Sequence, residues 1–516
     1  MRQKVALVGT GNFALNIAAL FSHFGVKLEF FVDEYRTEDF QGVPVFRATE
    51  LTRGQIDAAG KFVIAISYAE HCAAAVRRLQ DQGVPEQCIL VVADDPSIQI
   101  LRLLFEKFGD AAVDAFCREG CTSIPGLERD FLEASWQHVL TGLDPKRRTL
   151  GFCYYGRGGG FRRHLSPLIP YLKDRFNLVS VSDELMEGDG EIQGRHLFMG
   201  TESACRRSLF DLVFSAHVFP CSPPSVPRVT FSHVIYDFNL SLDYHAERIA
   251  RSDTHYVFAS SGPSLQGYVR LIKEKRLRNR LCVIPGGYMH LDENIELAAV
   301  YRGPVDSIIY APTLSLADYP HCDLATSMNE GSLIVERLLA GFPDFNIIFR
   351  PHPSDLKLFQ LNRRDARNGQ FSRLLELCRE HPRCLLDDNP TSYMKSYNRA
   401  ALMVSDTSST AMTFAFTTGR PVFFYAPRNN DLMATLGKQM SFVHDRCKVG
   451  EIATSLEDLM RQVEWYLLNE EGQRTEIKEF RDKVIFNVGN AGAYLARNVD
   501  YILHGEKHAE WLYFNW

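Results

Sequence analysis

Length, composition and charge exclude several classes of protein. At 516 residues the chain is too long for one ordinary domain, which predicts two to four domains. A composition of 46% hydrophobic and 23% charged residues is typical of a globular protein, and the net charge of -6 argues against a nucleic-acid partner. No apolar run approaches the roughly 20 residues of a membrane span, and we see no signal peptide, so we expect a cytoplasmic protein.

The cysteines do not indicate a metal site. Twelve are scattered along the chain without the paired spacing of zinc ligands. Cys117 and Cys121 are the closest two, and nothing nearby completes a site. We therefore expect free thiols in a reducing compartment and no bound metal.

The N-terminal stretch has the element order of a Rossmann unit. Residues 4–8 form an apolar strand, a glycine turn and a helix over 13–24 follow, and a second strand over 28–32 ends at Asp33. Further strands over 62–66 and 89–92 continue the sheet, which predicts a nucleotide-binding or accessory domain over residues 1–95.

Three residues of this unit are candidate nucleotide-binding residues. Gly9 permits the tight turn, Gly11 lets a ligand approach the backbone, and Asp33 stands where a ribose-binding acid would stand. Ala14 replaces the third glycine of the pattern. The candidate ligands are NAD and another nucleotide or nucleotide-sugar, and the alternative is a purely structural role.

A second pattern in this region has a known counterpart. Asp33-Glu34-Tyr35 and Gly42-Val43-Pro44-Val45 resemble the small N-terminal nucleotide-binding domain of bacterial sugar acyltransferases. The resemblance covers roughly residues 1–95 and implies a domain that binds a nucleotide-sugar or serves as a scaffold.

A second Rossmann-like domain is expected over residues 148–300. A helical connector over 96–147 precedes it. A strand over 149–155 leads into a glycine loop, 156–160, and a strand over 178–181 follows the next helix. The glycine loop indicates either a backbone close to a ligand or a flexible connection.

A basic run lies near the end of this domain. Its members are Lys273, Lys275, Arg276, Arg278 and Arg280. A solvated helix face is the ordinary interpretation. The alternative is contact with an anionic acceptor or a lipid headgroup, which would place the protein peripherally at the inner face of the cell membrane.

Four polar turns punctuate the third domain, residues 301–516. Each follows a predicted strand, and together they comprise 310–313, 350–353, 387–388 and 405–409. Ligands of open α/β sheets bind at the carboxyl ends of the strands, so we expect these turns to form one site.

The last of these turns has the chemistry of an anion site. It precedes a short predicted helix over 411–418, so free backbone N–H groups, hydroxyls and the positive end of the helix dipole converge there. The alternative is a serine-rich helix cap without a ligand. The candidate donor-binding residues of all four turns are Pro312, Thr313, Arg350, Asp388, Ser405, Asp406, Thr407, Ser408 and Ser409.

The order of these turns resembles the CDP-glycerol glycerophosphotransferase family, the teichoic-acid and capsule polymerases of bacterial envelopes. The resemblance is strongest over residues 307–427 and implies the glycosyltransferase-B architecture, two Rossmann-like domains with the active site between them. It further implies that His352 is a functional histidine, that Ser408 and Ser409 hold the donor diphosphate, and that Asp406 is the acid before them.

The family also places a histidine in the acceptor-side domain. His233, in Phe231-Ser232-His233-Val234, is the best match, although the following glycine of the family is absent. His164, just after the glycine loop, is the competing candidate. Thr407 replaces the tyrosine usual in the family, so the donor can be a glycerol-phosphate nucleotide or a nucleotide-activated sugar, including a CMP-activated acidic sugar.

These observations predict an α/β protein with an N-terminal Rossmann-like domain followed by a two-domain glycosyltransferase-B arrangement. The expected activity is transfer of a glycosyl or polyol-phosphate group from a nucleotide-activated donor to a cell-envelope glycan or lipid-linked acceptor. A cationic or hydrogen-bonding His352 would stabilise the leaving group, and an acceptor-side histidine would act as base.

The chain contains no Asp-x-Asp triplet, so we expect metal-independent transfer without a required cofactor. The alternatives are a nucleotide-sugar epimerase on the same fold and a non-catalytic nucleotide-sugar-binding scaffold. The sequence makes no prediction of the oligomeric state.

Overall fold

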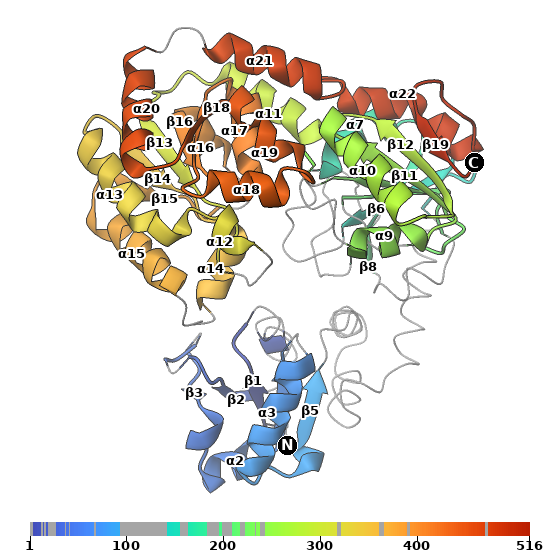
Figure 1. Ribbon diagram of the computed structural model, residues 1–516. Helices are drawn as coiled ribbons and strands as arrows, with labels where there is room; N and C mark the ends of the chain where they lie inside the picture. The colour runs from blue at the N-terminus through green and yellow to red at the C-terminus, as the bar shows by residue number, and fades with distance from the viewer. Residues whose placement is uncertain are drawn as a thin grey trace. The chain divides into compact units, whose positions relative to one another are not determined.

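The computed structural model divides into two compact units, residues 1–144 with 180–204 and residues 145–179 with 205–516 (Figure 1). The residues that it describes are 4–11, 14, 17–18, 27–36, 38–40, 42–66, 69–92, 142–154, 164–182, 196–198, 209–216, 222–232, 234–237, 243–316, 321–360, 366–389, 393–469 and 473–516. Most of the expected helix over 13–24, nearly all of the connector over 96–147 and the glycine loop lie outside the described residues.

The N-terminal unit contains a five-stranded sheet in the order β3-β2-β1-β4-β5. Its strands are β1 Lys4–Val8, β2 Lys27–Val32, β3 Val45–Phe46, β4 Lys61–Ala65 and β5 Ile89–Val92, and its helices are α2 Arg53–Ala59 and α3 Ala69–Asp81, with short turns of 3-10 helix at Ala48–Glu50 and Glu86–Cys88. Every neighbouring pair of strands is parallel. This order is that of a Rossmann sheet, as expected from the element pattern.

An eight-stranded sheet follows, in the order β19-β12-β11-β10-β9-β6-β7-β8. Its strands are β6 Thr149–Tyr154, β7 Asn177–Ser182, β8 His196–Phe198, β9 Leu212–Ser215, β10 Arg228–Phe231, β11 Thr254–Ala259, β12 Arg280–Pro285 and β19 Leu512–Phe514. The pairs from β6 through β9, β10 and β11 to β12 are parallel, whereas β19 runs antiparallel to β12. The end of the chain thus returns to this sheet, which the sequence analysis did not foresee.

The third sheet has six strands in the order β15-β14-β13-β16-β17-β18, all parallel. They are β13 Ser307–Ala311, β14 Asn346–Phe349, β15 Cys384–Leu386, β16 Ala400–Ser405, β17 Val422–Tyr425 and β18 Gly450–Ala453. Every residue of β13, β16 and β17 is buried, because helices cover both faces of a parallel sheet. This burial explains why these strands read as continuous apolar runs.

Helices surround these two sheets (Figure 1). They are α7 Ile169–Leu172, α9 Asp243–Ala250, α10 Gly262–Glu274, α11 Met289–Val300, α12 Cys322–Ala325, α13 Gly331–Gly341, α14 Pro353–Gln360, α15 Ala366–Glu380, α16 Met394–Arg399, α17 Ser409–Thr418, α18 Asn429–Leu436, α19 Ser441–Asp445, α20 Leu456–Leu468, α21 Gln473–Val484 and α22 Ala491–His504, with short 3-10 turns at Ser166–Leu168, Met328–Glu330 and Arg446–Lys448. The predicted α/β class is confirmed: a sheet of Rossmann order in the N-terminal unit is followed by two further sheets of largely parallel strands.

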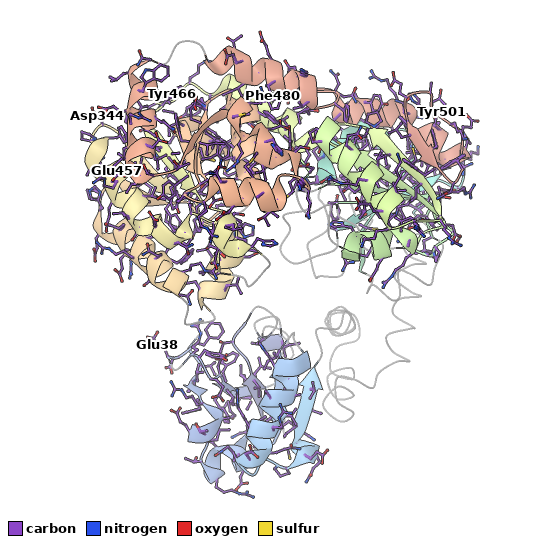
Figure 2. The ribbon with its side chains drawn as sticks, in the orientation of Figure 1. Glu38, Asp344, Glu457, Tyr466, Phe480 and Tyr501 are labelled. Carbon is purple, nitrogen blue, oxygen red and sulfur yellow. The ribbon has the colours of Figure 1, made fainter. Side chains whose placement is uncertain are left out.

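Two C-terminal helices pack against the third sheet through aromatic side chains. Figure 2 shows Tyr466 on α20 and Phe480 on α21. The Tyr466 ring lies 5.9 Å from that of Phe423 in β17, and the Phe480 ring lies 6.0 Å from that of Phe416 in α17. The Phe480 contact packs α17, whose N-terminus lies in the predicted anion site, against α21, and the Tyr466 contact packs α20 against β17.

Polar contacts join the second and third sheets within the same unit. The Asp237 carboxylate accepts hydrogen bonds from the backbone N–H groups of Ser441 and Phe442 at the start of α19. The Tyr236 hydroxyl donates to Asp445 at 2.6 Å. The segment after β10 is therefore anchored to the opposite domain. No helix among the described residues is both long and apolar enough to cross a membrane.

The first turn of the N-terminal unit requires glycine at one position. Gly9 has a φ of +108°, and a Cβ there would lie 3.0 Å from the carbonyl oxygen of Ala65. Its N–H donates to the Val32 carbonyl at 2.8 Å. Gly11, by contrast, has open space where a Cβ would be.

We predict that Gly9→Ala destabilises the N-terminal sheet by about 1–3 kcal/mol, because alanine must adopt a disfavoured φ against a backbone oxygen. Hydrogen–deuterium exchange of the full chain should show faster exchange over 4–8 and 61–65. Gly11→Ala is the matched control and should leave exchange there unchanged. Equal effects of the two substitutions would contradict this account of the turn.

Candidate active site

The structure places the four polar turns at one edge of the third sheet. The turns follow β15, β14, β13 and β16, which are consecutive neighbours in the sheet and all parallel. Their carboxyl ends therefore meet along the same edge, where ligands of such sheets bind. Which side chains at this edge can contact a ligand depends on the hydrogen bonds that they already make.

Asp406 joins three segments of this edge. Its Oδ1 accepts the N–H groups of Thr313 at 2.8 Å and Ser408 at 3.1 Å. Its Oδ2 accepts the N–H and the hydroxyl of Ser327 at 2.7 and 2.8 Å. Burial raises the pKa of Asp406 to about 6, although these hydrogen bonds oppose the shift. Asp406 thus holds the turn after β13 against the start of α17.

The charge of Asp406 acts on a buried cation, the guanidinium of Arg446. Arg446 is fully buried, and burial lowers its pKa to about 10, while the charge of Asp406 acts in the opposite direction. The Arg446 guanidinium donates to the Val443 carbonyl and to Asn429 Oδ1. A fixed positive charge is therefore present within this part of the domain, and the sequence analysis missed it.

Two hydroxyls of the serine-threonine turn make internal contacts. Ser405 donates to the Ala311 carbonyl at 2.6 Å, and Thr407 donates to the Ala325 carbonyl at 3.0 Å. Both were candidate donor-binding residues. Their hydroxyl protons are used to hold neighbouring strands and loops, so their contribution is to the shape of the turn.

Ser408 and Ser409 differ from their neighbours. They begin α17, and among the described residues no hydrogen bond is recorded for either hydroxyl, nor does Ser408 cap the helix with its side chain. The first N–H groups of an α-helix lack partners within the helix and carry the positive end of its dipole. These two hydroxyls and the first turn of α17 can together hold an anion.

His352 is set up as a neutral hydrogen-bond donor. Its Nδ1 accepts the N–H of Ser354 at 3.2 Å, which leaves the ring proton on Nε2. Burial lowers the pKa of His352, Asp355 raises it and Arg350 lowers it further. Of the two roles expected for this side chain, cation and neutral donor, the geometry favours the neutral donor at pH 7.

Asp355 fixes the turn that carries His352. It is fully buried and accepts the N–H and hydroxyl of Ser315 and the N–H of Leu316. It therefore ties the start of α14 to the loop after β13. The sequence analysis missed this residue, although an acid in the first turn of a helix was a usable signal.

Arg350 anchors the turn after β15. Its Nη1 donates to Asp387 Oδ2 at 2.7 Å and to the Asn389 carbonyl at 3.1 Å, and its guanidinium lies 5.2 Å from the ring centre of Tyr393. Asp388 next to this pair is exposed. Arg350 thus has a structural partner in Asp387, while Asp388 remains on the surface at the edge. Of the other candidates there, Pro312 is buried and Thr313 is half-buried.

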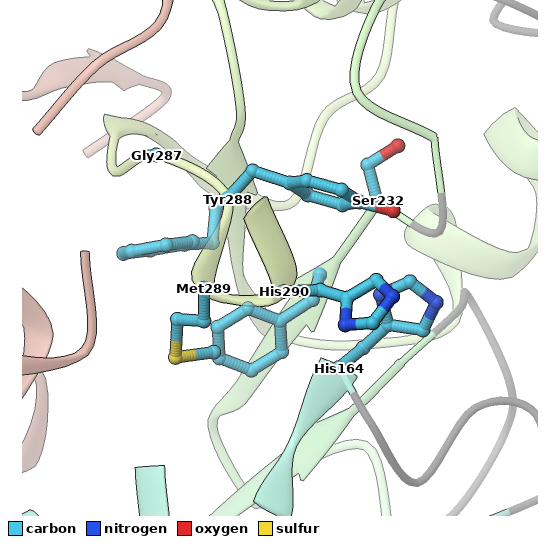
Figure 3. A pocket seen from close by; sticks show the side chains of 8 residues that line it. His164, Ser232, Gly287, Tyr288, Met289 and His290 are labelled. Carbon is cyan, nitrogen blue, oxygen red and sulfur yellow. The ribbon is translucent and has the colours of Figure 1, made fainter. Parts of the chain in front are cut away.

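A second cluster lies in the eight-stranded sheet, at the carboxyl ends of β10, β11 and β12 (Figure 3). The pocket there is lined by His164, Phe231, Ser232, Phe258, Gly287, Tyr288, Met289 and His290. The His164 ring lies 5.6 Å from the rings of both Tyr288 and His290. The pocket therefore contains one of the predicted acceptor-side histidines, whereas His233 lies outside the described residues.

His290 was missed by the sequence analysis. Its Nε2 is hydrogen-bonded to the hydroxyl of Tyr393, which follows β15 in the other domain, and Asn294 Nδ2 donates to the same hydroxyl at 2.9 Å. A strand end followed by two glycines and a histidine was a usable signal.

At the N-terminal candidate site, the carboxylate of Asp33 already accepts hydrogen bonds from residues of the neighbouring turns. Thr10 donates its hydroxyl to Asp33 Oδ2 at 2.8 Å, and Asp33 Oδ1 accepts the N–H groups of Tyr35 and Arg36. A ribose role for Asp33, and nucleotide binding at Gly9 and Gly11, stay predictions. Within the described residues no cluster of three or more histidine, cysteine or acidic side chains is arranged to hold a metal ion.

Residues 296–501 match the model of a known family, described as CDP-Glycerol:Poly(glycerophosphate) glycerophosphotransferase. This segment carries that family's domain. The resemblance predicted from the polar turns is confirmed over this segment, and the match supports a glycerophosphotransferase-like enzyme. The matched segment contains all four turns of the third sheet together with His352 and α17. A search of curated proteins found no match.

Solved structures also resemble the chain. The wall teichoic acid polymerase TagF is 13% identical, with 72% of this chain and 93% of that chain covered and a TM-score of 0.44. A putative UDP-N-acetylglucosamine 2-epimerase from Listeria monocytogenes is 12% identical, with 70% and 99% covered and a TM-score of 0.47. The UDP-GlcNAc 2-epimerase from Neisseria meningitidis is 11% identical, with 68% and 99% covered and a TM-score of 0.43.

The raised pKa of Asp406 predicts a pH dependence of stability. Its folded value of about 6 exceeds the ordinary 3.8, so the folded state holds this proton more strongly than the unfolded state. Its contribution to the free energy of unfolding is therefore largest at low pH and falls by about 2 kcal/mol between pH 4.5 and 6.5.

Urea unfolding at several pH values checks this expectation by comparing the wild type with Asp406→Asn. The variant should be less stable throughout, because an amide cannot accept all four hydrogen bonds, and it should lack this part of the pH dependence. If both proteins change in parallel between pH 4.5 and 6.5, the raised pKa is wrong.

Proposed function

We propose that the chain transfers a glycosyl or polyol-phosphate group from a nucleotide-activated donor to a cell-envelope glycan or lipid-linked acceptor. The observation that carries the proposal is the pairing of an anion site, Ser408 and Ser409 at the start of α17, with the Nε2–H of His352 on the same sheet edge. Both lie in the segment that matches the family.

The start of α17 and His352 contact different parts of one donor molecule. His352 follows β14 and Ser408 follows β16, and β13 lies between these strands. Neighbouring strands are about 4.8 Å apart, so the two turns are separated by about 10 Å at the sheet edge. We assign the nucleotide phosphate to α17 and the end of the donor that reacts to His352.

The reaction needs charge stabilisation where the leaving nucleotide gains electrons. The acceptor hydroxyl gives its proton to an acceptor-side imidazole, for which His164 and His233 are the candidates. Its oxygen then attacks the anomeric carbon or the phosphorus of the transferred group. The bond to the nucleotide phosphate breaks, and its electron pair stays on a phosphate oxygen that the helix N–H groups and the serine hydroxyls stabilise.

Asp406 and Asp355 make this arrangement rigid before the donor binds. Because each carboxylate accepts hydrogen bonds from the loop after β13, the phosphate-binding turn and the His352 turn are both fixed to the central strand of the sheet. Donors held in place beforehand stabilise developing charge without a cost of reorganisation at the moment of reaction.

We further propose that the reaction takes place at the inner face of the cell membrane. The supporting observation is the basic run at the end of α10. Its members Lys273, Lys275, Arg276, Arg278 and Arg280 are exposed, as a surface that contacts an anionic acceptor or headgroup requires.

Replacing the hydroxyl of Ser408 tests the phosphate assignment. Ser408→Ala should lower turnover at least tenfold and weaken the thermal shift caused by the donor nucleotide. The donor is found beforehand with a panel of CDP-, CMP-, UDP-, GDP- and dTDP-linked compounds. Ser405→Ala is the matched control, because its hydroxyl donates to the Ala311 carbonyl, and it should mainly lower stability. A normal rate and nucleotide shift in Ser408→Ala would contradict the assignment.

Replacing His352 tests its role as a neutral donor. His352→Ala should lower turnover at least tenfold, whereas His352→Gln retains an N–H donor and should recover part of the rate. The measurement is nucleotide release with and without acceptor in proteins of equal thermal stability. Release of free nucleotide and an altered sugar without any acceptor would instead identify an epimerase.

A further inference from the structure

Two cysteine thiols meet beside the outermost strand of the third sheet. Cys378 lies in the last turn of α15, and Cys384 is the first residue of β15. Both are free thiols, and their Sγ atoms are 3.4 Å apart. The fold thus brings two oxidisable groups into contact at a place where the proposed transfer reaction has no use for either of them.

The turn between the two cysteines is held by hydrogen bonds. The His381 N–H donates to the Leu377 carbonyl, and the Cys384 N–H donates to the His381 carbonyl, each at 2.9 Å. The Arg383 guanidinium donates to three backbone carbonyls of the segment 339–345 and so anchors the turn to the end of α13. Groups that are held next to each other in this way react together much faster than free groups do.

Bond formation between the two sulfurs needs only a small displacement. The sulfurs of a disulfide are about 2.0 Å apart, so these two Sγ atoms must approach each other by about 1.4 Å. Cys378 lies at the end of a helix, where the backbone frays more readily than in the helix interior. The helix side of the contact can therefore supply the movement.

The two sulfurs contribute different properties to such a reaction. Cys378 is half-buried, whereas only 2% of Cys384 is exposed, so a small oxidant reaches the pair from the side of Cys378. The hydrogen bond with Cys378 lowers the pKa of the Cys384 thiol. Because the thiolate is the reactive form of cysteine, the pair combines an accessible sulfur with a stabilised thiolate.

Metal binding is the other chemistry that neighbouring thiols offer. A structural zinc site needs four ligands, and the described residues contain no group of three or more histidine, cysteine or acidic side chains arranged to hold a metal ion. Oxidation to a disulfide needs only the two sulfurs that are present. The geometry therefore favours redox chemistry at this pair.

We propose that Cys378 and Cys384 form a redox site, at which a peroxide converts the two thiols into a reversible disulfide. The new bond cross-links α15 to β15, which lies at the end of its sheet and, among the described strands, pairs with β14 alone. β15 leads directly to Asp387, the partner of Arg350. Oxidation thus fixes the strand that carries one of the four polar turns. This chemistry is independent of the proposed transferase function.

With hydrogen peroxide the atoms and electrons balance. The thiolate of one cysteine attacks a peroxide oxygen, the O–O bond breaks, and a sulfenic acid and hydroxide form. The second sulfur attacks the sulfenic sulfur, the S–O bond breaks, and another hydroxide leaves. The two thiol protons convert both hydroxides into water, so two electrons pass from the sulfurs to the peroxide oxygens. A dithiol reverses the reaction by thiol–disulfide exchange.

Peptide mapping of the full chain tests the bond directly. The reduced wild type is treated with an equimolar amount of hydrogen peroxide, alkylated with iodoacetamide and digested with trypsin. Arg379 and Arg383 lie between the two cysteines, so cleavage places them in separate peptides. We expect these peptides to be linked, with two hydrogens less than their summed mass, and to separate in dithiothreitol. The link should form at least fivefold faster in the folded chain than in urea.

Cys447→Ser is the matched control, because Cys447 is an exposed thiol outside the pair, and it should leave the yield of linked peptides unchanged. Cys378→Ser should leave Cys384 as a free thiol that is alkylated after unfolding. Both cysteines alkylated in the peroxide-treated wild type, Cys378 converted to a sulfinic acid beside a free Cys384, or equal rates in the folded chain and in urea would each overturn the proposal.

Hydrogen–deuterium exchange tests the cross-link in the folded chain. Exchange over residues 376–386 should be slower in the oxidised wild type, and dithiothreitol should restore the original rate, because the disulfide restrains the end of α15 against β15. Peroxide should not change this exchange in Cys378→Ser. Identical exchange in the oxidised and reduced wild type would contradict a cross-link between the two elements.

Discussion

The buried carboxylate of Asp406 is the interaction on which the rest of the site depends. It accepts four hydrogen bonds: one from Thr313 in the loop after β13, two from Ser327, and one from Ser408 at the start of α17, so it joins α17 to two segments that precede Asp406 by 79 and 93 positions. Burying a carboxylate is costly unless it is hydrogen-bonded, and these four hydrogen bonds compensate part of that cost, although burial still raises the pKa of Asp406 to about 6. Asp406 uses the N–H of Ser408, so the donors that remain for a ligand are those of the first turn of α17 and the hydroxyls of Ser408 and Ser409.

The sequence was sufficient to predict the α/β architecture and the four polar turns that follow neighbouring strands, whereas the function of these turns stays a prediction. Strands such as β13 and β16 are buried on both faces and therefore read as apolar runs, and the polar residues after them mark the carboxyl edge without ambiguity. Which polar residues face a ligand could not be predicted, because that depends on partners distant in the chain. Ser405 and Ser408 look alike in sequence, yet Ser405 is bound to Ala311, which lies 94 positions earlier.

His290 and the end of the chain were missed for the same reason. His290 acquires its significance from Tyr393, more than 100 positions away, and no local pattern encodes that contact. The aromatic C-terminus likewise forms β19 on the sheet of the preceding domain, which hydrophobic periodicity cannot indicate. By contrast, the Gly9 turn was predictable, because its requirement for a positive φ is a local property of the backbone.

The central claim is that the N-terminus of α17 holds the phosphate of a nucleotide-activated donor. Hydrogen–deuterium exchange of the full chain, with and without the nucleoside diphosphate that gives the largest thermal shift, measures this most directly. The account predicts protection confined to residues 405–412 and the neighbouring turns after β13 and β14. Protection confined to the glycine turn of the N-terminal unit, with no change at the start of α17, would contradict it.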